Sequence, residues 1–149
     1  MRAVVQRVHR AEVRVDDAVV GHISRGLLIY LGVGLNDTEK DLDWLVNKVV
    51  GLRIFPDEDD HMNRSLKDVE GEALVISQFT LFGDVRRGKR PSFTNAMPPE
   101  GADRLYRRFC EAIAAKAVHV ERGVFGAMME VSSTNAGPVT ILLDSEKKF

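Results

Sequence analysis

The chain has 149 residues, of which 44% are hydrophobic and 29% are charged, and its formal net charge is −1. This length and composition predict a single globular domain over residues 1–149 with a sizeable core. The longest apolar stretches are strand-sized, so we expect no membrane span. The near-neutral charge argues against strong non-specific binding of nucleic acid.

Other features bear on location and partners. The start of the chain has no long apolar region followed by a small-residue cleavage site, so we expect no secretory signal. The single cysteine, Cys110, cannot form an internal disulfide, which is compatible with a reducing cytoplasm. Positive charge is nevertheless concentrated in two segments, one with Arg86, Arg87, Lys89 and Arg90 and the other with Arg104, Arg107 and Arg108.

In the first half of the chain, valine-rich segments at 3–8 and 11–15 predict strands, and Asp16-Asp17 predicts a turn into a strand at 18–23. Residues 27–33 are nearly all apolar and predict a central strand. The run Asn36-Asp37-Thr38 can cap a helix whose apolar stripe follows from residue 42 to residue 49. An acidic loop at 56–60 and a short buried strand at 73–77 complete this half.

In the second half, Pro98-Pro99-Glu100 predicts the start of a second helix, with apolar residues on one face from Ala102 to Ile113. Three short strands are expected after it, near 118–121, 127–132 and 139–143. Many strands and two long helices predict an α/β or α+β domain, but the strand order does not follow from the sequence.

Two segments combine small, polar and backbone-exposing residues with the end of an apolar strand. The first is Ser77-Gln78-Phe79-Thr80-Leu81, which follows the apolar run 73–76. The second is Asn135-Ala136-Gly137-Pro138-Val139-Thr140, which precedes the apolar run 141–143. Backbone N–H groups at a strand end, with the Gln78 amide or the Thr80 hydroxyl, can form an oxyanion hole. On the residues alone, a polar strand exit and an ordinary trans Gly-Pro turn remain open.

Conventional catalytic groups are missing from the pattern. No G-x-S-x-G motif is present, and Cys110 lies on the apolar face of a predicted helix. The four histidines are scattered without metal-ligand spacing, and the acidic run 57–60 lacks the spaced ligands of a calcium loop. The sequence therefore predicts no metal, no cofactor and no activated thiol.

The two strand-end segments resemble the signature motifs of the D-aminoacyl-tRNA deacylases, which remove D-amino acids and glycine from mischarged tRNA. The resemblance runs through the whole chain, because further segments lie in the family's order: Gln6-Arg7-Val8, Gly26-Leu27-Leu28, Arg90-Pro91-Ser92-Phe93 and Phe125-Gly126-Ala127. It implies an α/β fold in which a compact mixed sheet curls into a barrel-like core, packed by two main helices and assembled as a homodimer.

The resemblance also assigns roles to residues. It implies catalysis by the segment Ser77, Gln78, Phe79 and Thr80, on the acceptor end of an aminoacyl-tRNA. It implies a cis bond at Gly137-Pro138, whose backbone carbonyls leave no space for an L side chain and which reaches into the partner subunit's pocket. The substrate's own ribose hydroxyl is expected to assist, since no general base accompanies Thr80.

Three more substrate-binding residues follow from the resemblance. Phe125 and Met129 are expected to hold the terminal adenine, and Arg7 is expected to brace Gly137-Pro138. On spacing alone, Phe125 and Met129 are ordinary core residues and Arg7 is a surface charge. The chain departs from the family at 60–63 and at Ala136, where an acidic residue is common, which puts the fine positioning of Gly137 in question.

Two alternatives stand beside a tRNA-editing hydrolase. A non-catalytic nucleic-acid-binding protein on the same fold would not need both strand-end segments. A generic esterase would need a nucleophile–base pair, which the sequence does not offer.

Overall fold

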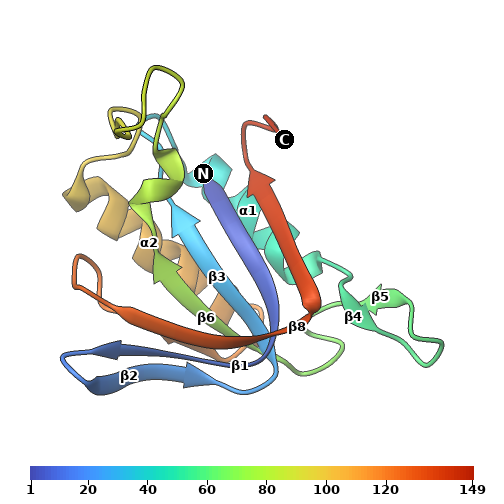
Figure 1. The fold of residues 1–149 in the computed structure, drawn as a ribbon. Coiled ribbons are helices and arrows are strands. Elements are labelled where there is room, and N and C mark those ends of the chain that lie inside the picture. Colours follow the sequence, from blue (N-terminus) through green and yellow to red (C-terminus); the bar gives the residue numbers. More distant parts are fainter.

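A computed structural model describes residues 1–149 as a curled sheet with two helices on one face (Figure 1). The strands of the main sheet are β1 (Arg2–Val15), β2 (Ala18–Ile23), β3 (Gly26–Gly32), β6 (Glu72–Ser77), β7 (Val120–Arg122) and β8 (Glu130–Asp144). The helices are α1 (Glu39–Gly51), α2 (Pro99–Ala114) and the short 3-10 helix η1 (Phe79–Phe82). A separate small hairpin contains β4 (Phe55–Pro56) and β5 (Met62–Arg64).

The main sheet is mixed, and its order is β2-β1-β3-β6-β7, with β8 also paired to β1. The β3–β6 and β6–β7 pairs are parallel, whereas β1 is antiparallel to β2, β3 and β8. The β1–β2 hairpin folds back over the sheet until Gly21 of β2 packs against β7. A Cβ at Gly21 would lie 2.7 Å from the carbonyl oxygen of Arg122, so only glycine fits this closure. The expected curled, barrel-like sheet with two helices is therefore confirmed.

Two pairs of predicted strands are in fact single long strands. The segments at 3–8 and 11–15 are both part of β1, and β8 joins the segment at 139–143 to the one predicted at 127–132, from Glu130 onward. The register between β1 and β8 shifts on either side of Val8, opposite the bend at 135–138 of β8. Polar residues and Pro138 at these bends are typical of strand ends, so the sequence predicted separate strands. Because β1 and β8 pair with each other on both sides of the bends, each continues as one strand.

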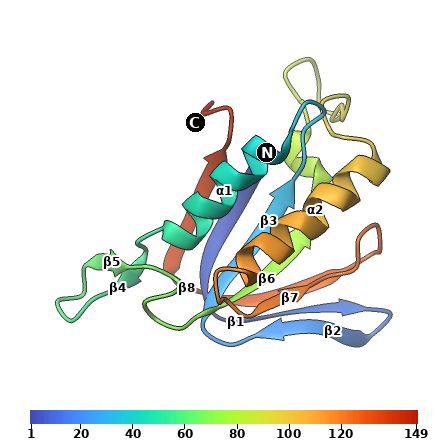
Figure 2. The same cartoon turned by 180° about the vertical axis from the view of Figure 1, so that it is seen from behind.

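The helices cover one face of the sheet (Figure 2). The stripe expected for α1 is buried against that face, and so is the inner face of α2 with Leu105, Phe109 and Ile113. Asp41 accepts a hydrogen bond from the Thr38 amide at 2.8 Å, which fixes the start of α1 where the sequence predicted a cap. Neither helix is long and apolar enough to cross a membrane.

The core has two parts, one on each face of β3 and β6. The larger part lies between the sheet and the helices and contains Ala73 and Val75. The smaller lies inside the curl and contains Leu74 and Ile76. Because successive residues of a strand alternate between faces, β6 is buried on both sides until it ends at Ser77. The polar segment after Ser77 therefore starts where the core stops.

Candidate functional site

A pocket of about 420 Å³ opens at the end of β6. Ser77 and Phe79 form one wall, and the first turn of α2 forms another with Pro98, Pro99 and Ala102. Phe93 and Phe125 contribute aromatic rings from two loops. Most of the lining is apolar, so the pocket suits a flat, weakly polar group such as a nucleobase, with Ser77 among its polar borders.

The chain leaves the sheet at Gln78. Its amide donates to the Leu31 carbonyl at 2.8 Å, which is the last ladder bond before η1 begins. The Leu81 and Gly83 amides then donate to the carbonyls of Gln78 and Thr80. The first N–H groups of such a helix have no acceptor within it, so those of Phe79 and Thr80 remain available. Two backbone donors thus lie beside the pocket.

Side chains add polar groups to the same segment. The Gln78 amide donates to the Thr80 hydroxyl, and Thr80 is exposed. No histidine or carboxylate is a hydrogen-bond partner of either Ser77 or Thr80. The geometry can therefore stabilise charge on a bound carbonyl oxygen, but it does not contain an activated alcohol.

Aromatic rings shape the mouth of the pocket. Phe79 is 55% exposed, and its ring meets that of Phe93 edge-on, with 5.0 Å between centroids. Phe125 packs 6.0 Å from the ring of Tyr106, whose hydroxyl donates to the Val75 carbonyl at 2.8 Å. The hydration of an exposed phenylalanine ring is unfavourable, and a ligand that covers the ring removes this cost. Phe79 and Phe93 therefore offer a surface on which a base can stack.

The second strand-end segment forms a bend braced by Arg7. The Arg7 guanidinium donates to the Ala136 carbonyl at 3.0 Å and to the Ile54 carbonyl at 2.6 Å. The Gly137–Pro138 peptide bond is cis. Gly137 has a φ of +125°, and a Cβ there would lie 2.9 Å from the Arg7 guanidinium, so the bend requires glycine.

Ala136 is buried, and only its main-chain carbonyl takes part in the bond to Arg7. Asn135 closes the bend by accepting from the Val139 amide and donating to Thr140, both at 3.1 Å. An alanine in place of the family's acidic residue therefore leaves the Arg7 contact intact.

The two segments are at opposite ends of the sheet within one chain (Figure 1). Ser77 is in register with Leu31, whereas Arg7 and the bend are in register with Leu27 and Ala73, four residues further down. Three strand spacings also separate β6 from β8. At about 3.3 Å per residue and about 4.8 Å per strand, Ser77 and Gly137 are separated by roughly 20 Å measured along the sheet.

Met129 does not line the pocket with Phe125. It packs against the smaller core part, and its sulfur is 2.5 Å from where a Cβ would stand on Gly123. Phe125 and Met129 thus do not line the same pocket of one chain. The role of Met129 in binding adenine stays a prediction.

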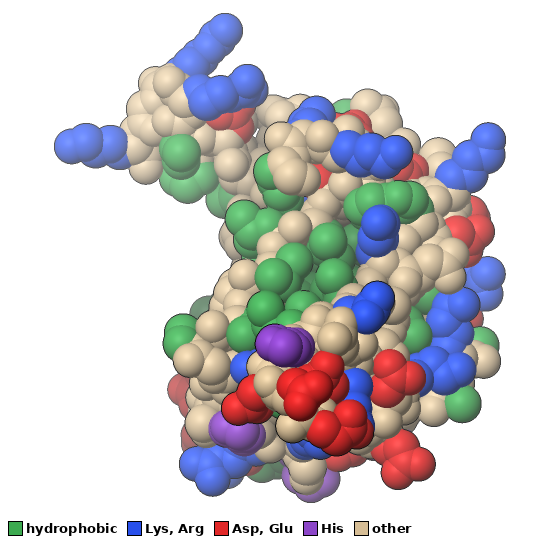
Figure 3. All heavy atoms as spheres, turned by 90° about the vertical axis from the view of Figure 1, so that its right-hand side faces the viewer, with side chains coloured by type: hydrophobic (Ala, Val, Ile, Leu, Met, Phe, Trp, Pro, Cys, Tyr) green, Lys and Arg blue, Asp and Glu red, His purple; other side chains and the backbone are tan.

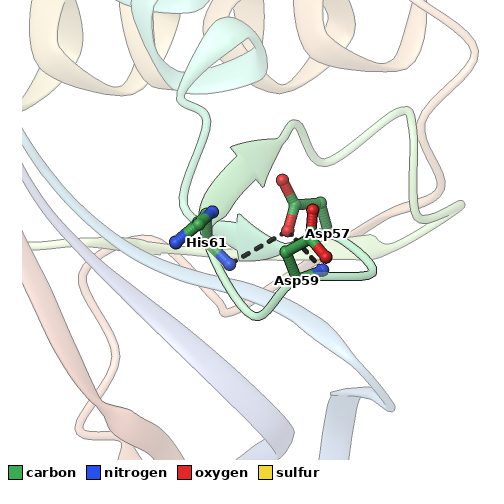
Figure 4. Close-up of side chains that lie close together, drawn as sticks. All are labelled: Asp57, Asp59 and His61. Carbon is green, nitrogen blue, oxygen red and sulfur yellow. Dashed lines mark hydrogen bonds between the residues drawn. The ribbon is translucent and has the colours of Figure 1, made fainter.

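The acidic loop brings Asp57, Asp59 and His61 together, with one possible ligand atom from each within 4.8 Å (Figure 4). The Asp57 carboxylate already accepts from the amides of Asp59 and His61 and from the Asn63 side chain. The hydrogen bond from Asn63 is the first cause of a lowered pKa of Asp57. The Asp57 carboxylate therefore stabilises the conformation of the loop. We do not propose a metal at Asp57, Asp59 and His61.

The lone cysteine is remote from this chemistry. Cys110 is buried, and burial raises the pKa of its thiol to about 12. It is therefore protonated at neutral pH and a poor nucleophile. The prediction that Cys110 is a core residue is confirmed.

Several pocket residues were not predicted as site residues. Phe93 appeared only within a family segment, and Pro98 and Pro99 only as a helix start. Met97 and Ala96, which also line the pocket, carry no sequence signal of their own. An aromatic side chain in the polar segment 90–95 was the one available hint, since loop aromatics often contact ligands.

A sheet end with free backbone donors beside an apolar, aromatic pocket has the chemistry to hold an aromatic group that carries a polar substituent. Comparison with known proteins makes this specific. The family model described as D-Tyr-tRNA(Tyr) deacylase matches residues 4–144. The chain belongs to this family of D-aminoacyl-tRNA deacylases, which are hydrolases.

Relatives named D-aminoacyl-tRNA deacylase support the assignment over the full length. One from Thermotoga petrophila is 60% identical and one from Kosmotoga olearia is 58% identical, each with 100% of both chains covered. Among solved structures, one titled c-Myc DNA Unwinding Element Binding Protein is 43% identical, with a TM-score of 0.91 and coverage of 97% of this chain and 98% of that one. A probable eukaryotic D-amino acid tRNA deacylase shares the fold at 21% identity, with a TM-score of 0.82 and coverage of 95% and 97%.

Proposed function

We propose that this protein hydrolyses the ester bond of D-aminoacyl-tRNA and of glycyl-tRNA, and rejects L-aminoacyl-tRNA. The observation that carries the proposal is the segment from Ser77 to Thr80, which has free backbone donors and lines an apolar pocket through Ser77 and Phe79. Family membership supplies the substrate class.

In the proposed mechanism, the terminal adenosine of the tRNA occupies the pocket beside Phe125. The ester carbonyl then lies against the amides of Phe79 and Thr80, which stabilise the oxyanion formed when water attacks. The C–O bond to the ribose breaks, and the ribose oxygen takes a proton. Because Thr80 has no base beside it, the neighbouring ribose hydroxyl of the substrate assists this proton transfer.

Chirality is proposed to be read by main-chain atoms of the Gly137–Pro138 bend. Backbone placed against the Cα of the bound amino acid leaves no space for an L side chain. A D side chain points away from it, and glycine has none. The contacts from Arg7 hold the bend in a fixed position, which a steric filter of this kind requires.

The bend and the pocket are too far apart to meet in one chain, so we propose a homodimer in which each subunit's bend completes the other's pocket. An apolar face supports this assembly. Val4 is in register with both Tyr30 and Leu142, so the three share the face that the helices do not cover. Leu142 is 55% exposed, and Figure 3 shows hydrophobic side chains along this hollowed side of the molecule.

The test is an assay with three substrates: D-tyrosyl-tRNA, L-tyrosyl-tRNA and a simple activated ester. The proposal expects cleavage of the first alone, and equally of other D-aminoacyl-tRNAs and glycyl-tRNA, because the filter reads configuration. Efficient cleavage of L-tyrosyl-tRNA would refute the filter. Cleavage of the simple ester would favour a generic esterase.

A second assay separates substrate assistance from a protein nucleophile. Thr80→Ala should leave measurable activity, whereas a tRNA ending in 2′-deoxyadenosine should lose most of it. Trapping of a covalent acyl-Thr80 species would instead assign the attack to Thr80.

One observation favours a second candidate function. A solved structure 43% identical to this chain is titled as a DNA unwinding element-binding protein. A non-catalytic nucleic-acid binder would bind both aminoacyl-tRNAs and cleave none of the three substrates, so the same assay decides between the two functions.

A further inference from the structure

A projecting loop near the pocket concentrates positive charge. Residues 85–91 are closed at the base by a two-bond bridge, in which the amides of Asp84 and Ser92 donate to each other's carbonyls at 2.8 and 2.9 Å. Figure 3 shows this loop as the projection at the upper left, with Lys and Arg side chains extending into solvent. All four cations of the loop are exposed: Arg86, Arg87, Lys89 and Arg90.

Most of this charge is not neutralised within the protein. Arg86 pairs with Asp84 at 2.6 Å, and its hydrogen bond holds the pKa of that carboxyl at about 2. Arg87, Lys89 and Arg90 have no acidic side chain within 4.0 Å. Since the whole chain has a net charge of −1, the rest of the protein is negative and the loop stands out against it.

The arginines of α2 offer a direct contrast. Arg107 pairs with Asp103 at 2.9 Å, and Arg108 contacts Glu111 at 3.4 Å and Glu39 at 3.6 Å. The charges of Arg107 and Arg108 are therefore neutralised by carboxylates of the same protein. A cluster of cations therefore does not by itself give a segment the capacity to attract an anion.

The loop is joined to the pocket by a short, packed connection. Phe93 follows the bridge, lines the pocket and stacks edge-on against Phe79. Arg90 is three residues before Phe93, so its Cα is at most roughly 10 Å from that of Phe93. A cation on a flexible side chain at this range can reach a group that extends out of the pocket, but not one buried within it.

We infer that the loop 85–91 binds phosphates of the tRNA strand just before its terminal nucleotide. This inference rests on the proposed function, because it needs the terminal adenosine in the pocket. A polynucleotide leaving the pocket carries one negative charge per nucleotide, and unpaired Arg and Lys are suited to it. Such contacts position the strand without reading its sequence.

Each neutralised phosphate of a single strand contributes about −0.7 to the slope of log affinity against log salt. Replacing Arg87 and Arg90 should therefore reduce the salt slope of KM by about 1.4. KM for D-tyrosyl-tRNA should rise about tenfold at low salt, with kcat unchanged, because the ester itself is still held by the pocket.

The experiment compares two double variants of equal charge change: Arg87→Gln/Arg90→Gln in the loop and Arg107→Gln/Arg108→Gln on α2. Each is assayed between about 50 and 200 mM KCl on D-tyrosyl-tRNA and on D-tyrosyl-adenosine, which lacks the preceding phosphates. The loop variant should show a raised KM for D-tyrosyl-tRNA and an unchanged KM for D-tyrosyl-adenosine. The α2 variant should match the wild type on both substrates.

Each other outcome is decisive. Equal losses in the two variants would reduce the effect to net charge and overturn the inference, as would an unchanged KM in the loop variant. A similar rise in KM for D-tyrosyl-adenosine would overturn it too, by showing that the loop acts through the pocket. Failure of the wild type to cleave either substrate would instead refute the proposed function.

Discussion

The two ends of the sheet carry different kinds of recognition. At the end of β6, side chains and free amides surround a cavity, and Ser77 and Phe79 are part of its wall. At the bend of β8, the exposed element is main chain, with Gly137 and Pro138 held from behind by Arg7. The first end is built to hold a ligand, and the second to be placed against one.

This contrast explains why a single chain is an incomplete enzyme in our account. A filter made of main chain discriminates only where it touches the bound amino acid, and the bend is far from its own pocket. Separation of binding and discrimination onto distant surfaces makes assembly part of the chemistry. Changes at either end should therefore affect activity in different ways.

The largest effect is expected at Gly137. In Gly137→Ala, the new Cβ would meet the Arg7 guanidinium at 2.9 Å and the Val139 amide at 3.2 Å, at a φ of +125° that L residues rarely adopt. The bend must shift, so kcat/KM for D-tyrosyl-tRNA should fall about a hundredfold, or about 2.7 kcal/mol.

Gly51→Ala is the matched control, because a Cβ there meets nothing within 4 Å and Gly51 ends α1 without a positive φ. It should keep wild-type kinetics. Full activity with intact rejection of L-tyrosyl-tRNA in Gly137→Ala would remove the bend from the mechanism.

A smaller effect is expected at Arg7. Arg7→Lys keeps the charge, but a single ammonium cannot reproduce the two guanidinium bonds to the carbonyls of Ala136 and Ile54. The bend should loosen, with kcat/KM about tenfold lower and some L-tyrosyl-tRNA now cleaved. Steady-state kinetics on both substrates measures this loss of selectivity.

Arg10→Lys serves as its control, since Arg10 is exposed on the same strand. If both lysine variants retain the same selectivity, the bracing role of Arg7 is wrong.

The smallest effect is expected at Cys110, which belongs to neither end. Because burial raises the pKa of this thiol to about 12, it stays protonated below that pH and should not titrate in a rate profile between about pH 6 and 9. Iodoacetamide should leave the native enzyme active, and mass spectrometry should find no adduct. Stoichiometric alkylation with loss of activity would contradict the buried position.

Much of the fold could be predicted where the pattern of apolar residues within one segment determines the element. The apolar run before Ser77 marked β6, and the stripe beginning at Leu42 marked α1. The continuity of β1 and β8 could not be predicted, because it depends on pairing between residues more than a hundred positions apart, such as Val5 and Ile141. Local signals at Gly137 and Pro138 even argued for a strand end.

The site shows the same division. Ser77 to Thr80 could be located, because a polar segment directly after a buried strand is unusual. The resemblance also pointed to Arg7, whose contacts with Ala136 and Ile54 join segments far apart in sequence. The pocket walls at Phe93 and Met97 could not be predicted, since which loops fold over the end of β6 depends on the packing of α2.

The central claim, that two chains share each site, is tested most directly by complementation. Gln78→Ala and Gly137→Ala, each with a different affinity tag, are mixed under exchange conditions and the heterodimer is purified through both tags. One of its two pockets then contains neither change, so it should recover roughly half of the wild-type activity while each parent stays weak. No recovery in a verified heterodimer, or full activity in a demonstrated monomer, would contradict the account.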